Sequence, residues 1–182
     1  MNIHEPQPSV GAWTPPAALA ALAPAEVRSA RPDDAGAIHA LIAAHAAPGR
    51  LLPRTREDVE AHVRRFVVAT TGDEVVGCAE LAPLGADLAE IRSLVVAEDA
   101  RGMGIGRSLA SSVVEAAAAT SCRRLCAFTH APAFFVRLGF SLVPHLQLPE
   151  KVALDCAGCP LFRACGQQAV LLTRPATAGA RQ

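Results

Sequence analysis

The spacing of hydrophobic residues predicts four helices in this chain. In the first, an apolar face recurs from Ile38 to His45 at helical spacing, and Asp33 or Asp34 can cap its start. Thr55 opens the second, with an acidic residue three positions later as in a capping box. A long Ala-rich helix is expected at roughly residues 104–120, and a short one at 133–138.

Seven stretches of apolar and β-branched residues, bounded by turn residues, predict strands. The segment Thr71-Gly72-Asp73-Glu74 separates two of them and is typical of a hairpin turn. Antiparallel hairpins come first and a strand-helix-strand unit follows, which predicts a mixed α/β sheet. The strands are expected at residues 26–30, 66–70, 75–81, 88–96, 125–129, 140–143 and 169–173.

Length and composition favour one folded domain with polar or Pro-rich ends. The chain has 182 residues, of which 51% are hydrophobic, enough to bury a core. We expect a flexible Ala/Pro-rich arm at residues 1–24, a domain at 25–174 and a disordered tail at 175–182. The start lacks a signal peptide, and no apolar run is long enough to span a membrane. A cytoplasmic location is therefore expected.

Charge gives no argument for a polyanionic partner. The 17 basic residues equal the 17 acidic ones, so neither nucleic acid nor an anionic membrane is expected as a partner. An anionic small molecule would have to be held by local features of the chain.

Three of the six cysteines form a C-x2-C-x5-C pattern. Cys156, Cys159 and Cys165 have spacing that can hold zinc, with Asp155 or His145 as a possible fourth ligand. The alternative is a loop with small, partly buried thiols or a redox-labile pair. Any metal would be structural, and in a cytosolic protein the thiols would stay reduced.

The segment Arg101-Gly102-Met103-Gly104-Ile105-Gly106-Arg107 carries the clearest chemical signal. It lies between a predicted apolar strand and the long helix, where glycines allow close approach of a ligand and the helix start attracts anions. Arg101 and Arg107 can add charge-assisted hydrogen bonds to a polyphosphate. The glycine spacing fits neither a dinucleotide-binding fingerprint nor a Walker loop. The alternative is an ordinary tight turn into a helix.

Arg101, Gly104 and Gly106 match the coenzyme A signature of the GNAT acetyltransferase superfamily. In that signature an Arg or Gln is followed by two residues, a Gly, one residue and a Gly or Ala. The resemblance continues through residues 134–140 and covers roughly residues 26–174. It implies a mixed, mostly antiparallel sheet flanked by helices and splayed between its fourth and fifth strands, with acetyl-CoA as cosubstrate. The implied cofactor-binding residues are Leu94, Val95, Val96, Arg101, Gly102, Met103, Gly104, Ile105, Gly106 and Arg107.

A closer resemblance is to the short, GNAT-only N-acetylglutamate synthases. It is carried by residues 51–57, 76–79, 89–96 and 149–165. It implies transfer of acetyl from acetyl-CoA to the α-amine of L-glutamate, the first step of arginine biosynthesis. The alternatives are a GNAT enzyme for another small amine or a protein N-terminus, and a non-catalytic sensor that binds acetyl-CoA or a metal.

Amino-acid acetylation needs a carboxylate anchor and a group that accepts the amine proton. Arg54 is the predicted anchor, because a guanidinium can bind a carboxylate through two parallel bonds. Arg92 and Lys151 are weaker second anchors, and Thr129 can orient the substrate. Glu90 is the predicted general base, and Ser93 completes the predicted catalytic set.

Each of these residues also has a plainer interpretation. Arg54 would otherwise be a solvated cation near a helix start. Glu90 and Arg92 share a face of their strand and would otherwise pair there. The chain has no Tyr, and Phe135 stands where many GNAT enzymes carry a tyrosine acid, so tyrosine acid catalysis is excluded. Solvent or His130 would then protonate the leaving thiolate. Possible homodimerisation follows from the family alone.

Overall fold

The computed structural model describes residues 25–46, 51–159 and 162–174. Its strands form one sheet of order β1-β2-β3-β4-β5-β7-β6, and every neighbouring pair is antiparallel except β4 and β5. The strands are β1 (Glu26–Ser29), β2 (Phe66–Thr71), β3 (Glu74–Pro83), β4 (Leu88–Val96), β5 (Arg124–Thr129), β6 (Ser141–Val143) and β7 (Gln168–Thr173). The predicted mixed, mostly antiparallel fold is therefore confirmed. The predicted arm at 1–24 and tail at 175–182 lie outside the described residues.

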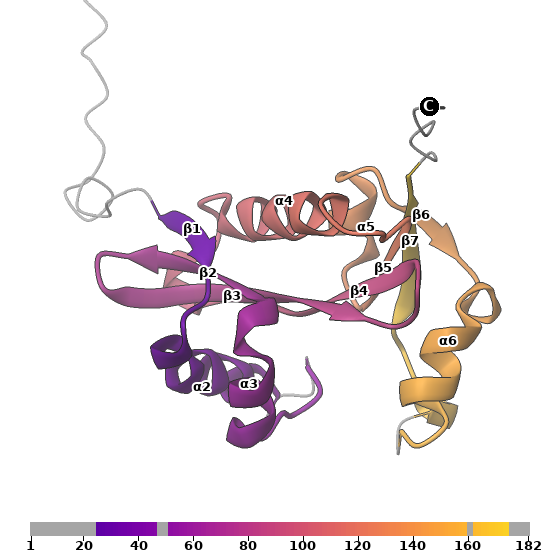
Figure 1. Ribbon diagram of the computed structural model, residues 1–182, viewed down its shortest axis with the longest axis horizontal. Coiled ribbons are helices and arrows are strands. Elements are labelled where there is room, and N and C mark those ends of the chain that lie inside the picture. Colours follow the sequence, from indigo (N-terminus) through magenta and orange to yellow (C-terminus); the bar gives the residue numbers. More distant parts are fainter. Residues whose placement is uncertain (1–24, 47–50, 160–161, 175–182) are drawn as a thin grey trace, which may run out of the picture.

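Helices cover both faces of the sheet (Figure 1). The helix α4 (Ile105–Ala118) lies on one face, and α2 (Ala35–Ala46) and α3 (Arg56–His62) lie on the other. Two further helices, α5 (Pro132–Val136) and α6 (Pro149–Lys151), belong to the C-terminal part of the chain. In the described part of the chain, no helix has the length and apolar character needed to span a membrane.

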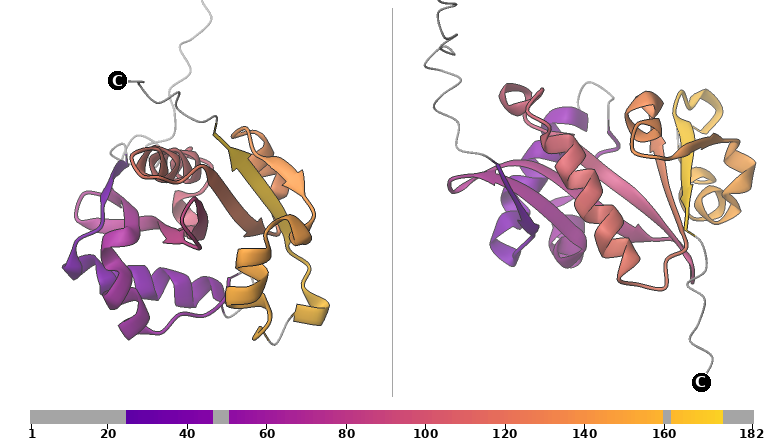
Figure 2. Two further views of the ribbon diagram at one scale, coloured as in Figure 1. Left: turned by 45° about the vertical axis from the view of Figure 1, so that its right-hand side comes forward. Right: turned by 90° about the horizontal axis from the view of Figure 1, so that it is seen from above.

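Alternation along the strands builds a separate apolar core on each face. On β2, Val67 and Ala69 pack toward α4, whereas Phe66 and Val68 pack toward α2 and α3. Figure 2 shows the sheet between these two helical layers. The apolar residues that alternate along the strands are thus covered by helices on both faces of the sheet.

Of the two predicted helix caps, Thr55 caps α3, whereas the Asp34 carboxylate accepts from the N–H of Arg31 upstream of α2. Thr55 accepts a hydrogen bond from the Asp58 N–H at 3.2 Å and so caps α3. Asp34 ends a short 3₁₀ turn before α2, accepts from the Arg31 N–H at 2.6 Å and pairs with Arg28. The Arg28 side chain, through its hydrogen bond, lowers the pKa of the Asp34 carboxyl.

Two features differ from a simple sequence interpretation. The segment expected as a cysteine-bearing loop contains α6, which continues through a π-helical turn at Val152–Cys156. The last strand in the chain, β7, lies between β5 and β6, a strand order that the sequence did not predict. Lys151 and Asp155 in this helical segment contact Glu90 and Arg92 of β4.

Candidate active site

The sheet forks where β4 meets β5. These two strands pair in parallel along only three residue pairs, ending at Glu90 opposite Cys126. Beyond Glu90, β4 continues to Val96 along β3, whereas β5 continues along β7. The predicted splay between the fourth and fifth strands is therefore confirmed, and Glu90 lies at its narrow end.

A bulge interrupts β4 on the side of the fork that faces the glycine-rich loop. Glu80 pairs with Arg92 and Cys78 with Val95, so β4 has one residue more than β3 between these pairs. Ser93 has a φ of 50°, and its carbonyl oxygen accepts a bond from the Cys78 thiol at 3.6 Å. A bulge leaves backbone groups unpaired with the neighbouring strand. The predicted residues Ser93, Leu94, Val95 and Val96 thus lie where a ligand could bind along the open side of β4.

The glycine-rich loop leads directly into the N-terminus of α4. Gly102 and Gly104 both have a φ of 81°, a left-handed conformation that favours glycine. Gly104 is the N-cap of the 14-residue helix α4, whose first hydrogen bond runs from the Ser108 N–H to the Gly104 oxygen at 3.1 Å. The N–H groups just after the cap have no partner within a helix. This exposed cradle suits the oxygens of a pyrophosphate.

The two arginines of the loop differ in their surroundings. Arg107 is exposed in the first turn of α4. Arg101 folds back toward its own loop and donates to the Val96 oxygen at 3.3 Å. A cavity of about 390 Å³ adjoins the loop and is lined partly by Met103 and Ile105. The predicted cofactor residues thus form one continuous region from the β4 bulge to the start of α4.

Close packing of β3 against α4 holds this region in place. A Cβ atom at Gly77 would lie 3.0 Å from the Leu109 side chain and 3.1 Å from the Val95 oxygen. We expect Gly77→Ala to lower the free energy of unfolding by about 1–3 kcal/mol, because the backbone oxygen cannot move aside. Urea denaturation measures the effect. The matched control is Gly36→Ala in α2, where no atom lies within 4 Å of the added Cβ. Equal effects of the two substitutions would contradict this packing argument.

A buried charge cluster surrounds the narrow end of the fork. Glu90 is 3% exposed and accepts bonds at its Oε2 from Arg92 Nε at 2.5 Å and from Lys151 Nζ at 2.7 Å. Lys151 is also buried and donates to Asp155 Oδ2 at 2.9 Å, and Arg92 pairs with the same oxygen. The expected Glu90–Arg92 pairing is present. Lys151 belongs to α6, and its ammonium donates to both carboxylates of the cluster.

Arg54 joins the cluster from the other side of β4. Its Nη1 donates to Glu80 Oε2 at 2.7 Å, and its Nε pairs with Asp58 at the start of α3. The hydrogen bond from Arg54 lowers the pKa of the Asp58 carboxyl. Glu80 is 1% exposed and stands opposite Arg92 in the β3–β4 register. Arg54 is thus a mostly buried member of a charge network and not a solvated cation.

The remaining predicted polar residues lie at the end of β5. Thr129 ends β5, and its hydroxyl accepts a bond from the Ala131 N–H at 2.9 Å. His130 is exposed next to it. Phe135 is 4% exposed and packs edge-on against Phe134 and Phe140, with ring centroids 5.1 and 5.4 Å away. The position of the family tyrosine is therefore part of the core in this chain.

The cysteines do not provide an activated nucleophile at the fork. Burial raises the pKa of the Cys78 thiol to about 12, and burial likewise raises that of Cys126 far above its usual range. A buried neutral thiol is a poor nucleophile. Direct attack of the acceptor amine on the thioester fits these residues better than a cysteine-bound intermediate.

The predicted zinc site gains no support from the described residues. No group of three or more His, Cys, Asp or Glu side chains among them is arranged to hold a metal ion. Cys156 and Cys159 are half-buried and Cys165 is exposed, all as free thiols. Asp155, proposed as a fourth ligand, pairs with Arg92 and Lys151.

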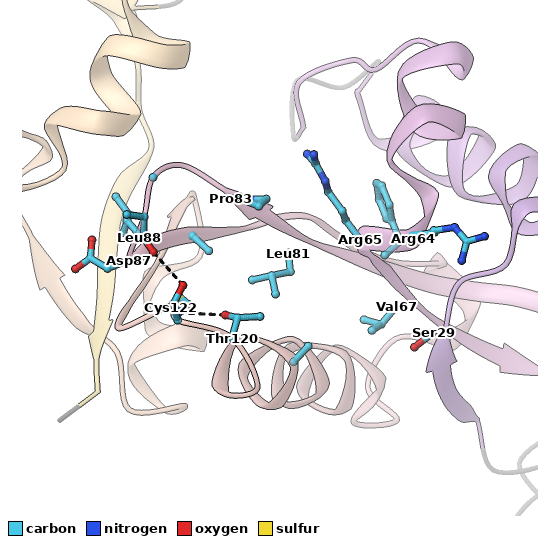
Figure 3. Close-up of a pocket in the computed structure, with 16 residues that line it drawn as sticks. Ser29, Arg64, Arg65, Val67, Leu81, Pro83, Asp87, Leu88, Thr120 and Cys122 are labelled. Carbon is cyan, nitrogen blue, oxygen red and sulfur yellow. Dashed lines mark hydrogen bonds between the residues drawn. The ribbon is translucent and has the colours of Figure 1, made fainter. Parts of the chain in front are cut away.

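A further cavity, of about 350 Å³, lies away from these residues. Figure 3 shows Arg64 and Arg65 at one end of it and Asp87 and Leu88 at the other, with Thr120 beside the C-terminal end of α4. None of the predicted site residues is among those that line it. The charge cluster and the glycine-rich loop therefore remain the candidate site.

Sequence reasoning missed two acidic members of the cluster. Glu80 stands opposite Arg92, so its place in the cluster could have been predicted only if the β3–β4 register was known. Asp155 follows Lys151 by four residues, a helical spacing that could have placed both side chains on one face.

Comparison with known proteins identifies the family. Residues 34–140 match the model of the acetyltransferase (GNAT) family. The uncharacterized N-acetyltransferase CT2212 of Chlorobaculum tepidum is 35% identical, over 81% of this chain and 95% of that protein. An amino-acid acetyltransferase of Mycobacterium tuberculosis is 34% identical, over 69% of this chain and 74% of the relative.

A solved structure extends the comparison to a ligand complex. N-acetylglutamate synthase from Neisseria gonorrhoeae, complexed with coenzyme A and N-acetyl-glutamate, matches with a TM-score of 0.75 and 27% identity. The match covers 84% of this chain and 36% of that one, so the chain spans about a third of the synthase. Together with the forked sheet and the glycine-rich loop, these matches establish that the chain belongs to the GNAT family of acetyltransferases.

Proposed function

We propose that this acetyltransferase transfers the acetyl group of acetyl-CoA to the α-amine of L-glutamate. The observation that carries the proposal is the position of Glu90, a buried carboxylate at the narrow end of the fork and in contact with two cations. The relatives named as amino-acid acetyltransferase and N-acetylglutamate synthase support the choice of acceptor.

The cofactor would bind along the open side of β4. The N–H groups of residues 102–107 would hold the pyrophosphate, and the backbone of Leu94 to Val96 would pair with the pantetheine arm. Val96 lies six positions after Glu90, which is about 20 Å along a strand. The thioester would thus approach the charge cluster, while the phosphates stay at the wide end of the fork.

The cations of the cluster have donors to spare for an acceptor carboxylate. A guanidinium carries five N–H groups. Arg54 uses Nε and Nη1 within the protein, and Arg92 uses Nε and Nη2. Within the described residues this leaves Nη2 of Arg54 and Nη1 of Arg92 for a dicarboxylate. Lys151 is more deeply buried than either arginine and is better placed to hold Glu90.

The reaction needs one proton acceptor and one stabilised oxyanion. Arg92 and Lys151 both donate to Oε2 of Glu90. Glu90 would therefore take a proton from the amine through Oε1, directly or by way of water. The amine nitrogen forms a bond to the acetyl carbon, and the carbon–sulfur bond breaks. A backbone N–H near the Ser93 bulge would stabilise the oxyanion, and solvent would protonate the thiolate.

A thiol-release assay with acetyl-CoA and a panel of amino acids, polyamines and a peptide N-terminus tests the proposal. Turnover selective for glutamate is expected. Turnover selective for another amine would reject the acceptor and keep the enzyme class. Tight coenzyme A binding without turnover on any of them would instead favour a sensor.

Arg54→Ala is expected to raise the KM for glutamate by about 10- to 100-fold, because a charged hydrogen bond contributes roughly 1.5–3 kcal/mol. Steady-state kinetics with both substrates varied measures this effect, and the KM for acetyl-CoA should stay within about twofold. The matched control is Arg56→Ala, since Arg56 is exposed and forms an ion pair with Glu60 of the same helix. If the folded Arg54→Ala variant has an unchanged KM for glutamate, Arg54 does not bind the acceptor.

A further inference from the structure

His45 connects the helical layer on one face of the sheet to the glycine-rich loop. It lies in the last turn of α2 and is 7% exposed. Its Nδ1 is 2.9 Å from the Leu41 oxygen, and its Nε2 is 2.5 Å from Nη2 of Arg101. The contact joins residues 56 positions apart in the chain.

The partners of His45 fix its chemical form. A carbonyl oxygen only accepts hydrogen bonds, so Nδ1 must carry the proton that it donates to Leu41. A guanidinium only donates, so Nε2 must accept from Arg101. The ring is therefore neutral, with each nitrogen assigned by its partner. His45 itself is buried, whereas the Arg101 side chain is partly exposed.

Arg101 spreads its remaining donors over the start of the same loop. Its Nε donates to the Val96 oxygen at the end of β4, and its Nη1 donates to Glu98 Oε1, both at 3.3 Å. Val96 closes the strand that would hold the pantetheine arm, and Gly102 follows Arg101 directly. The side chain of Arg101 thus links the end of β4, the loop and α2, and His45 supplies the acceptor from α2.

We propose that His45 is a positioning residue for coenzyme A, which acts by holding Arg101 so that the loop keeps the shape required to bind the pyrophosphate. The inference rests on the proposed placement of the pyrophosphate at residues 102–107. It assigns His45 a role in binding coenzyme A and none in proton transfer to or from the acceptor. His45 belongs to a helix on the face opposite α4, so this role reaches the loop from across the sheet (Figure 1).

Three substitutions separate the bond to Arg101 from the bond to Leu41. His45→Gln keeps an amide at the distance of Nε2 and can still accept from Arg101. His45→Asn is shorter, so it can reach the Leu41 oxygen but not Arg101. His45→Leu removes both bonds and places an apolar side chain of similar size at this position. Isothermal titration with coenzyme A, together with kinetics and urea denaturation, is measured for all three variants.

The expected result is a Kd for coenzyme A about tenfold higher in His45→Leu and His45→Asn, and within about twofold of the parent in His45→Gln. The kcat should stay within about twofold. Equal coenzyme A affinity in the Gln and Asn variants would overturn the proposal, as would a loss of stability with affinity unchanged.

A double-mutant cycle with Arg101→Leu supplies an independent check. If His45 acts through Arg101, His45→Leu should have little further effect on the Kd once Arg101 is replaced. Additive effects would show that His45 acts by another route. Because coenzyme A binding is measured directly, a wrong acceptor amine would not affect these outcomes. Failure of the parent protein to bind coenzyme A would instead refute the proposed cofactor site.

Discussion

Lys151→Met is expected to lower the free energy of unfolding by about 3–5 kcal/mol. Removing one partner of a buried ion pair leaves an uncompensated charge, and that penalty exceeds the value of the pair itself. In the parent, two cations face the carboxylates of Glu90 and Asp155. Without Lys151, both carboxylates depend on Arg92. Urea denaturation followed by circular dichroism measures the loss.

Two controls make this prediction specific. Arg56→Met removes an exposed pair with Glu60 four residues away and should change stability by no more than about 0.5 kcal/mol. The double variant Lys151→Met with Glu90→Gln leaves one cation and one carboxylate, Arg92 and Asp155, so it should recover part of the loss. A loss in Lys151→Met no larger than in Arg56→Met would show that the cluster carries little stability.

Glu90→Gln is expected to reduce kcat by about 10²- to 10⁴-fold, the usual contribution of a positioned general base. The amide keeps the size of the side chain but cannot take a proton from the attacking amine. The affinity for coenzyme A should stay within about twofold, because the glycine-rich loop is untouched. Single-turnover kinetics with saturating acetyl-CoA and glutamate measures the chemical step.

Asp155→Asn is the matched control for Glu90→Gln. It removes a negative charge from the same two cations, Arg92 and Lys151, but at a residue of the helical turn Val152–Cys156 instead of β4. We expect it to reduce kcat by less than tenfold. If Glu90→Gln keeps its kcat within about fivefold of the parent, another group or water must take the proton. If both variants lose the same activity, charge balance rather than proton transfer explains the effect.

Local signals in the sequence predicted most helices and strands to within one or two residues. The long helix expected at 104–120 occupies Ile105–Ala118, and the strand expected at 88–96 occupies Leu88–Val96. Caps, glycine turns and hydrophobic period act over a few residues, so they can be interpreted without the fold. The Glu90–Arg92 pairing followed from the period of two along one strand.

Long-range pairing could not be predicted in the same way. Nothing local to residues 168–173 indicates that β7 lies between β5 and β6. Lys151 reaches Glu90 from 61 residues farther along the chain, and His45 reaches Arg101 across 56 residues. Each contact depends on the packing of whole elements. The π-helical turn at Val152–Cys156 is also too short to give a periodic signal.

The short parallel contact between β4 and β5 has a mechanical consequence. The three residue pairs between β4 and β5 connect two parts of the sheet, β1-β2-β3-β4 and β5-β7-β6. A ligand that enters at the wide end and spreads the strands would rotate these two portions about that join. Displacement grows with distance from a pivot, so Leu94 to Val96 would move most and Glu90 least. The proposed binding surface can then adapt to its ligand while Glu90, the proposed proton acceptor, keeps its place.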